Sequence, residues 1–106
     1  MNDQIKQDIL AILSRLIEIF KIREEKDLPE IRALSNHTIH DASIFQDEDS
    51  ISIAVVTYAL AKVILRNPSG IDYEKFIKLC TNAHENLSSN RIDSYRNDIK
   101  NMLSCI

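Results

Sequence analysis

One short stretch of the chain holds the side chains best suited to acid–base or metal chemistry. It runs from Arg32 to Asp41, reads RALSNHTIHD, and contains His37 and His40. A histidine can transfer a proton while a nearby arginine balances the negative charge of a reacting phosphate. Two histidines and a carboxylate are also ligands that zinc accepts. The stretch is therefore a candidate catalytic site at Arg32, His37 and His40, or a candidate metal site at His37, His40 and Asp41.

The catalytic interpretation depends on the spacing of Arg32 and His37, which are separated by four residues. This spacing resembles the Arg–His motif of the HEPN superfamily of helical ribonucleases, whose Arg and His act together at a dimer interface. The resemblance implies a ribonuclease in which His37 transfers the proton and Arg32 steadies the charged phosphorane. The chain departs from that family in two ways: one long helix precedes the motif instead of two, and Ala33 replaces a polar residue.

The metal interpretation depends on His37 and His40, which lie one helical turn apart, with Asp41 four residues after His37. A zinc site needs three or four ligands in defined positions. Further oxygen ligands would have to come from the acidic run at 47–49. The His40–Asp41 pair is also similar to that of HD-domain phosphohydrolases, although the other two metal ligands of that family have no counterpart here.

The same side chains also fit a non-catalytic contact surface on the outside of a helix. In this interpretation, Asn36 and His40 hydrogen-bond to neighbouring loops. Asp41 either caps the helix that follows or pairs with Lys62. Arginine, asparagine and histidine adapt readily to partner groups, so a protein-binding surface is a third explanation of this stretch.

Five helical segments must position these residues. Apolar periodicity and capping signals predict helices over residues 3–25, 27–45, 50–66 and 71–87, and a fifth from an Asn90 cap to the end of the chain. One glycine and two prolines in the whole chain agree with a few long helices, because strand-rich folds need many turns.

The third segment, ISIAVVTYALAKVIL from Ile51 to Leu65, is apolar around almost its whole circumference. A helix without a polar face must be covered on all sides. We therefore expect it to be the buried central helix of a bundle. Lys62 shares a face with Ile51, Val55 and Tyr58, and it is expected to extend its charge to water or to pair with an acid.

Composition excludes several classes of protein. The chain has 106 residues, which favours one domain, and its formal net charge of −3 argues against strong nucleic-acid binding by this domain alone. Cys80 and Cys105 have no metal-binding or disulfide spacing, which predicts reduced thiols in a cytoplasmic protein. No apolar run reaches the length of a membrane span, and no glycine-rich loop or other motif indicates a cofactor.

The stretch LSNHTIHDASIFQDEDSISIAVVTYALAKVI, residues 34–64, carries a second resemblance. It is similar to the N-terminal helical region of a family of uncharacterised archaeal proteins, in which a short segment similar to helix-turn-helix antitoxins follows. The resemblance implies an archaeal cytosolic protein with a dimerisation or partner-binding domain, and it transfers no functional residue. The apolar end at Ile106 fits the N-terminal part of a longer protein.

The sequence thus predicts an all-α, single-domain bundle of about five helices over residues 1–106. Its predicted function is non-enzymatic: protein–protein interaction or dimerisation through apolar surface that the bundle leaves uncovered on the first or fifth helix. The predicted partner is a protein or a second copy, without a membrane. Two alternatives remain: a HEPN-like ribonuclease using Arg32 and His37, or the dimerisation part of a transcriptional or antitoxin-type regulator.

Overall fold

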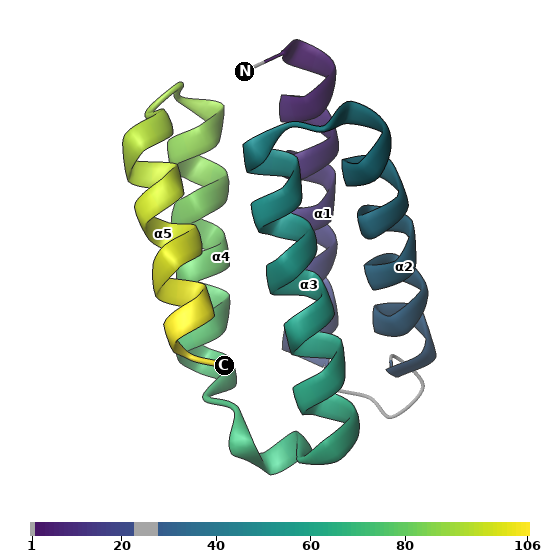
Figure 1. Cartoon of the computed structure of the whole chain (residues 1–106). Coiled ribbons are helices and arrows are strands. Elements are labelled where there is room, and N and C mark those ends of the chain that lie inside the picture. The colour runs from purple at the N-terminus through teal and green to yellow at the C-terminus, as the bar shows by residue number, and fades with distance from the viewer. Residues whose placement is uncertain (1, 23–27) are drawn as a thin grey trace.

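The computed structural model describes residues 2–22 and 28–106, and five α-helices lie in this part of the chain (Figure 1). They are α1 (Asp3–Ile22), α2 (Leu28–Phe45), α3 (Glu48–Arg66), α4 (Tyr73–Ser88) and α5 (Ile92–Ser104), with a 3-10 turn, η2 (Pro68–Gly70), before α4. The all-α fold predicted from the sequence is confirmed. The predicted end of α1 at Glu25 and the predicted cap of α2 at Asp27 lie outside the described residues.

The helices form two antiparallel hairpins, with α1 between them. α2 and α3 make the first hairpin, and α4 and α5 make the second (Figure 1). α1 packs mainly on α4 and also contacts α2 and α3, while α3 reaches across to α5. Short connections between antiparallel neighbours are typical of helical bundles.

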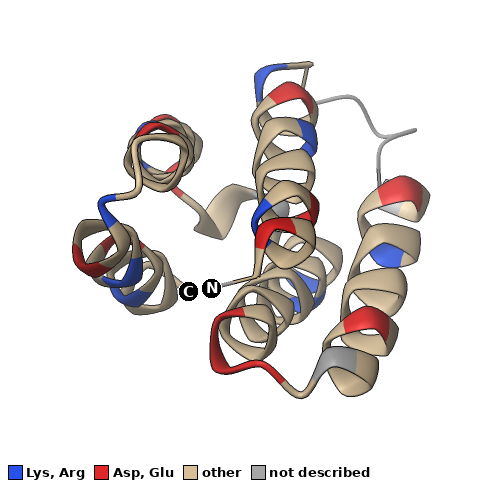
Figure 2. Ribbon diagram, turned by 90° about the horizontal axis from the view of Figure 1, so that it is seen from above, with Lys and Arg blue, Asp and Glu red and all other residues tan. Residues whose placement is uncertain are grey.

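Side-chain caps fix where α3 and α4 begin, as Asn2 does for α1. Asp47 Oδ2 accepts hydrogen bonds from the backbone N–H groups of Asp49 and Ser50, each at 3.1 Å, and so starts α3. Asp72 Oδ1 accepts one from the Lys75 N–H at 3.1 Å and starts α4. Acidic residues gather at the turn from α2 into α3 (Figure 2), as the sequence predicts for the positive end of that helix.

The turn from α4 to α5 differs from the prediction that Asn90 caps α5. Asn90 has a φ of 60° and ends α4 instead. Its N–H bonds the carbonyl of Leu87 at 3.1 Å, and the Arg91 N–H bonds that of Asn86 at 2.8 Å. Asparagine adopts this left-handed conformation more readily than most residues, which suits it to a helix end. Its side chain accepts a hydrogen bond from Lys6 Nζ at 2.8 Å, and α5 begins after Arg91 without a side-chain cap.

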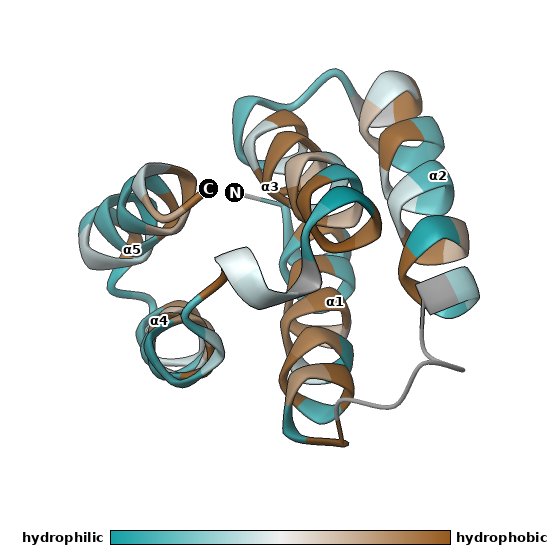
Figure 3. Cartoon of the chain, turned by 90° about the horizontal axis from the view of Figure 1, so that it is seen from below, coloured by the Kyte–Doolittle hydropathy of each residue, from teal (hydrophilic) through white to brown (hydrophobic). Residues whose placement is uncertain are grey.

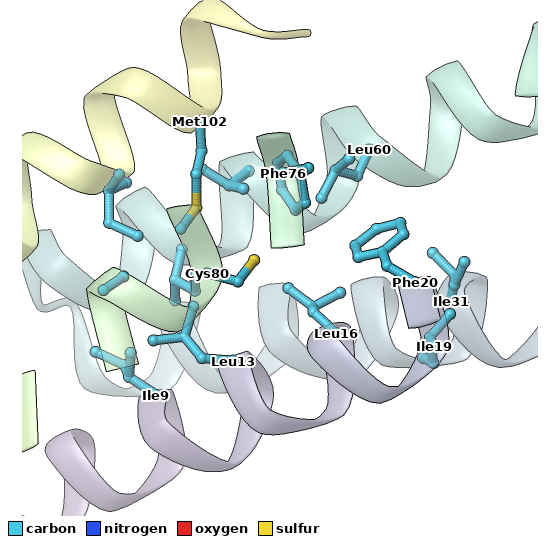
Figure 4. Packing of buried hydrophobic residues seen from close by; sticks show 14 of the residues in the cluster. Ile9, Leu13, Leu16, Ile19, Phe20, Ile31, Leu60, Phe76, Cys80 and Met102 are labelled. Carbon is cyan, nitrogen blue, oxygen red and sulfur yellow. The ribbon is translucent and has the colours of Figure 1, made fainter. Parts of the chain in front are cut away.

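All five helices contribute to one hydrophobic core. Apolar residues recur along α1, which lies between the hairpins (Figure 3). Phe20 of α1 meets Phe76 of α4 edge-on, with ring centroids 5.0 Å apart and planes at 71°. Ile31 of α2, Leu60 of α3 and Met102 of α5 belong to the same cluster (Figure 4). The burial of these apolar side chains is the main favourable contribution to the stability of the bundle.

α3 is a core helix, but it is not covered on all sides as the sequence predicts. It contributes nine buried residues. Four large apolar residues on its outer side nevertheless remain exposed: Ile51, Val55, Tyr58 and Leu65. The physical reason is geometric, because α1, α2 and α5 contact only part of its circumference. The outer side of α3 therefore presents apolar surface to water.

Candidate functional site

The structure does not bring Arg32 and His37 together within one copy of the chain. Both side chains are exposed on α2. Five residues apart on a helix, they point in directions about 140° apart. Arg32 lines a shallow hollow with Leu65 at the far end of α3. No hydrogen bond or ion pair joins Arg32 to His37 in the part of the chain that the structure describes.

Of the three candidate metal ligands, Asp41 lies close to each of the two histidines. His37 Nε2 lies 3.3 Å from Asp41 Oδ2, and His40 Nδ1 lies 3.7 Å from Asp41 Oδ1. Both imidazoles are exposed, so one carboxylate joins two histidines at the protein surface. Across residues 2–22 and 28–106, no group of three or more histidine, cysteine or acidic side chains is placed to hold a metal ion. Asp41 therefore serves as the partner of both histidines, and it does not pair with Lys62.

An ion pair that the sequence analysis missed connects α3 to α5. Arg96 donates to Asp49 through two hydrogen bonds, Nε to Oδ1 at 2.9 Å and Nη2 to Oδ2 at 3.0 Å. The Asp49 side chain is 7% exposed, whereas that of Arg96 is 55% exposed. The hydrogen bonds with Asp49 raise the pKa of Arg96 above its ordinary value. Forty-seven residues separate the partners in sequence, so no local pattern could have indicated the pair.

The Asp49–Arg96 pair lies in a cleft of about 410 Å³ between the start of α3 and α5. Beneath it, the Tyr95 hydroxyl is buried and has no hydrogen-bond partner among the described residues. Burial raises the pKa of Tyr95, and the nearby Asp49 charge raises it further, so the phenol is neutral. Acidic and basic side chains from Glu48, Asp93 and Lys100 also line the cleft. Charges of both signs, three acidic and two basic, line the cleft, which suits a structural link between helices.

Substituting either partner of this ion pair is expected to destabilise the bundle, and the two substitutions should differ in size of effect. Asp49→Ala should lower the free energy of unfolding by about 1–3 kcal/mol, because a charge-assisted double hydrogen bond is lost. Arg96→Ala should lower the free energy of unfolding by more, because it leaves the buried Asp49 carboxylate without its partner. In Asp49→Ala, by contrast, the exposed Arg96 side chain can be hydrated. Urea unfolding of both variants and of the double variant measures the coupling. Lys100→Ala, on the same helix as Arg96, is the control. If the losses of stability in the two single variants add up to the loss in the double variant, the prediction is contradicted.

Four of the exposed large apolar residues in the described part of the chain lie on the outer side of α3. Ile51, Val55, Tyr58 and Leu65 are 48%, 49%, 43% and 51% exposed. With two charged residues they form one row, which we call the α3 stripe: Glu48, Ile51, Val55, Tyr58, Lys62 and Leu65. Its members follow each other at alternating spacings of three and four. This is the heptad spacing by which one helix packs along another.

A groove beside the α3 stripe widens this apolar surface onto α2. It has a volume of about 390 Å³. Its apolar lining comes from both helices of the hairpin: Ile39, Ala42, Ile51, Ala54, Val55 and Tyr58. Large contiguous apolar surfaces are uncommon on monomeric proteins and usually mark contact sites. The α2–α3 groove and the α3 stripe together are therefore the candidate functional site.

The position of this site corrects the prediction that the uncovered apolar surface lies on the first or fifth helix. The wide apolar stripe of α1 is turned inward and contributes six buried residues. On α5 and just after it, Leu103 and Ile106 are exposed at the end of the chain without forming a row. The signal for the correct position was present in the sequence, because Ile51, Val55 and Tyr58 share a face with Lys62. A charged residue within an apolar row marks the side that faces water.

Lys62 itself supports the apolar row instead of interrupting it. Its Nζ lies 4.7 Å from the ring centroid of Tyr58, the preceding member of the α3 stripe. This distance is within the range of cation–π attraction. The aliphatic stem of a lysine that reaches back over a neighbouring ring covers apolar surface while its charge stays hydrated. The α3 stripe is thus apolar in the middle, acidic at Glu48 and basic towards Lys62.

Comparison with known proteins adds no further assignment: no protein-family model matches the chain, and neither the curated proteins nor the solved structures contain a significant match. Among the described helices, none combines the length and apolar character needed to cross a membrane.

Proposed function

We propose that this chain is a non-enzymatic association domain that forms a dimer through the α3 stripe and the α2–α3 groove. The observation that carries the proposal is the uncovered row at Ile51, Val55 and Tyr58, which lies beside an apolar groove. Covering such side chains removes apolar area from water at roughly 25 cal/mol per Å². This gain favours association, although ordering and lost translational freedom offset part of it.

A second copy of the same chain is the partner that this surface fits. The α3 stripe has Glu48 at its first end and Lys62 near its last end, with Arg66 one turn beyond. A surface that carries opposite charges at its two ends complements itself when it is turned around. Two-fold dimers use the same patch on both copies, so this self-complementarity is the property that such an interface requires.

The ribonuclease alternative has less support, because a HEPN-like site needs Arg32 and His37 at the dimer interface, and neither side chain lines the α2–α3 groove. Proton transfer needs the catalytic groups within hydrogen-bond reach of the same reacting atom. The regulator alternative remains compatible with the proposal, since it uses a dimerising surface of the same kind. Dimerisation through α3 is therefore the common element that an experiment should test first.

Val55→Glu is expected to convert the dimer into a folded monomer. Val55 lies in the middle of the α3 stripe and is half exposed, so a glutamate there should change the stability of the monomer by only about 0.5 kcal/mol. In the dimer, the same change would bury a carboxylate against an apolar partner surface, which is costly. Light scattering after size exclusion, over a range of protein concentrations, measures the mass. Circular dichroism checks the helical content.

Leu103→Glu is the matched control, because Leu103 is an exposed apolar residue on α5 that does not belong to the α3 stripe, although it lines the same cleft as Glu48. This variant should keep the mass of the wild-type protein. A wild-type protein that is monomeric at every concentration would overturn the proposal. If Val55→Glu stays dimeric and Leu103→Glu is monomeric, the interface lies on α5 and not on α3.

A further inference from the structure

We infer that the two copies pack antiparallel along α3, in a single register that sets Val55 of each copy against Tyr58 of the other. This inference rests on the proposed dimerisation and adds its orientation and its residue pairs. The spacing and the charges of the α3 stripe set the register, and the α2–α3 groove sets the lateral position of the second helix.

The spacing of the α3 stripe defines the possible pairings. Glu48, Val55 and Lys62 occupy one heptad position, and the other three members occupy the second: Ile51, Tyr58 and Leu65. In an antiparallel pair of helices, residues of the first kind face residues of the second kind. One register pairs every member of the α3 stripe in this way. It sets Val55 opposite Tyr58, Ile51 opposite Lys62, and Glu48 opposite Leu65.

The charges at the ends favour this antiparallel register. The α3 stripe is about 26 Å long, from the rise of 1.5 Å per residue over its length. When the second copy runs in the opposite direction, Glu48 lies within one turn of Lys62 and Arg66 of that copy. Two-fold symmetry repeats this contact at the other end of the pair. Each Glu48 also lies near the negative C-terminal end of the opposing α3, and the basic side chains of Lys62 and Arg66 lie between the two negative groups.

A parallel dimer would set like charges against each other. Glu48 would face Glu48 of the second copy, and Lys62 would face Lys62 of the second copy. Like charges placed opposite each other at an interface disfavour the pairing. The parallel arrangement therefore removes two attractive contacts and adds two repulsive ones with the same apolar residues in the middle. The charges therefore favour the antiparallel orientation, which apolar packing alone would not distinguish from the parallel one.

The α2–α3 groove supplies the lateral position of the second helix. Ile39 and Ala42 of α2 and Ala54 of α3 line the groove, and both alanines are buried at its base. Small residues at the floor allow close approach of another helix, so the α3 of each copy fits against the groove of the other. The four helices α2 and α3 from both copies then form an antiparallel four-helix arrangement, the usual product of hairpin dimerisation.

Position-specific crosslinking tests the orientation. Cys105→Ser is the background, because Cys80 is fully buried and the Cys105 thiol is the more accessible of the two. Glu48→Cys and Leu65→Cys are prepared as separate variants, and each is then treated with a short bis-maleimide alone or after mixing and exchange. In the antiparallel dimer, only the mixed sample places two thiols side by side. Identical thiols lie about 26 Å apart, out of reach of the reagent.

We expect crosslinked product in the mixed sample at least about tenfold above either variant alone. Ile51→Cys mixed with Lys62→Cys, which share the same register, should repeat the result. Efficient crosslinking of each variant alone would overturn the antiparallel orientation in favour of a parallel one. A stable dimer mass without crosslinks in either pair would place the interface elsewhere. A monomeric wild-type protein would instead remove the proposed function, so the two failures are distinguishable.

Discussion

Phe20→Ala is expected to lower the free energy of unfolding by about 3–5 kcal/mol. The Phe20 ring is 1% exposed, and it lies at the contact of α1 with α4, edge-on to Phe76 at 5.0 Å and 5.8 Å from Tyr73. Alanine would remove both aromatic contacts and leave a cavity between helices that lie far apart in the sequence. A domain of this size has roughly 5–15 kcal/mol of total stability, so the variant should be close to unfolding.

Ile22→Ala is the matched control, because Ile22 lies two residues further along α1 and is 54% exposed. Its cost should stay within about 0.5 kcal/mol. Urea unfolding followed by circular dichroism measures both values, and an unchanged slope with denaturant would show that the same amount of surface is exposed. Equal losses from the two substitutions would contradict the packing of α1 against α4.

The periodic apolar residues of α1, α4 and α5 allowed their helices to be predicted, because one face of each helix meets the rest of the bundle. The same reasoning failed on the outer side of α3. Hydropathy does not distinguish an apolar side chain that is buried within the bundle from one that faces water, and Val55 is of the second kind. The Asn90 cap was wrong because asparagine suits both ends of a helix, and only the backbone conformation decides which one.

The candidate site could be predicted only in part, for two reasons that particular residues show. His37 and Asp41 are one turn apart, so helical geometry alone places them in contact, as the sequence indicated. Arg32 and His37 looked like a pair in sequence, yet a five-residue step turns them apart on the helix. The Asp49–Arg96 link joins the two hairpins, and the sequence could not place those hairpins relative to each other.

Alkaline pH is expected to destabilise the fold through Cys80. Burial raises the pKa of this thiol from 9.0 to about 12, because the core around it, including Leu13 and Met102, cannot solvate a thiolate (Figure 4). Between these two values the unfolded chain loses the Cys80 proton while the folded chain keeps it. Unfolding then releases a proton, so stability falls as the pH rises, by about 1.4 kcal/mol per pH unit. The contribution is fully present below pH 9 and is lost by about pH 12.

Cys80→Ala separates this effect from other titrations at high pH. The variant has no thiol at that position, so any cost of the smaller side chain is independent of pH. Urea unfolding from pH 8 to 11 should show a slope shallower than that of the wild type by about 1.4 kcal/mol per pH unit above pH 9. Cys105→Ser, which removes the more accessible thiol at the end of α5, should keep the wild-type slope. Identical slopes for Cys80→Ala and the wild type would mean that Cys80 is not buried among α1, α4 and α5. Such a result would also contradict the inward-facing stripe of α1, which belongs to the same core cluster as Cys80.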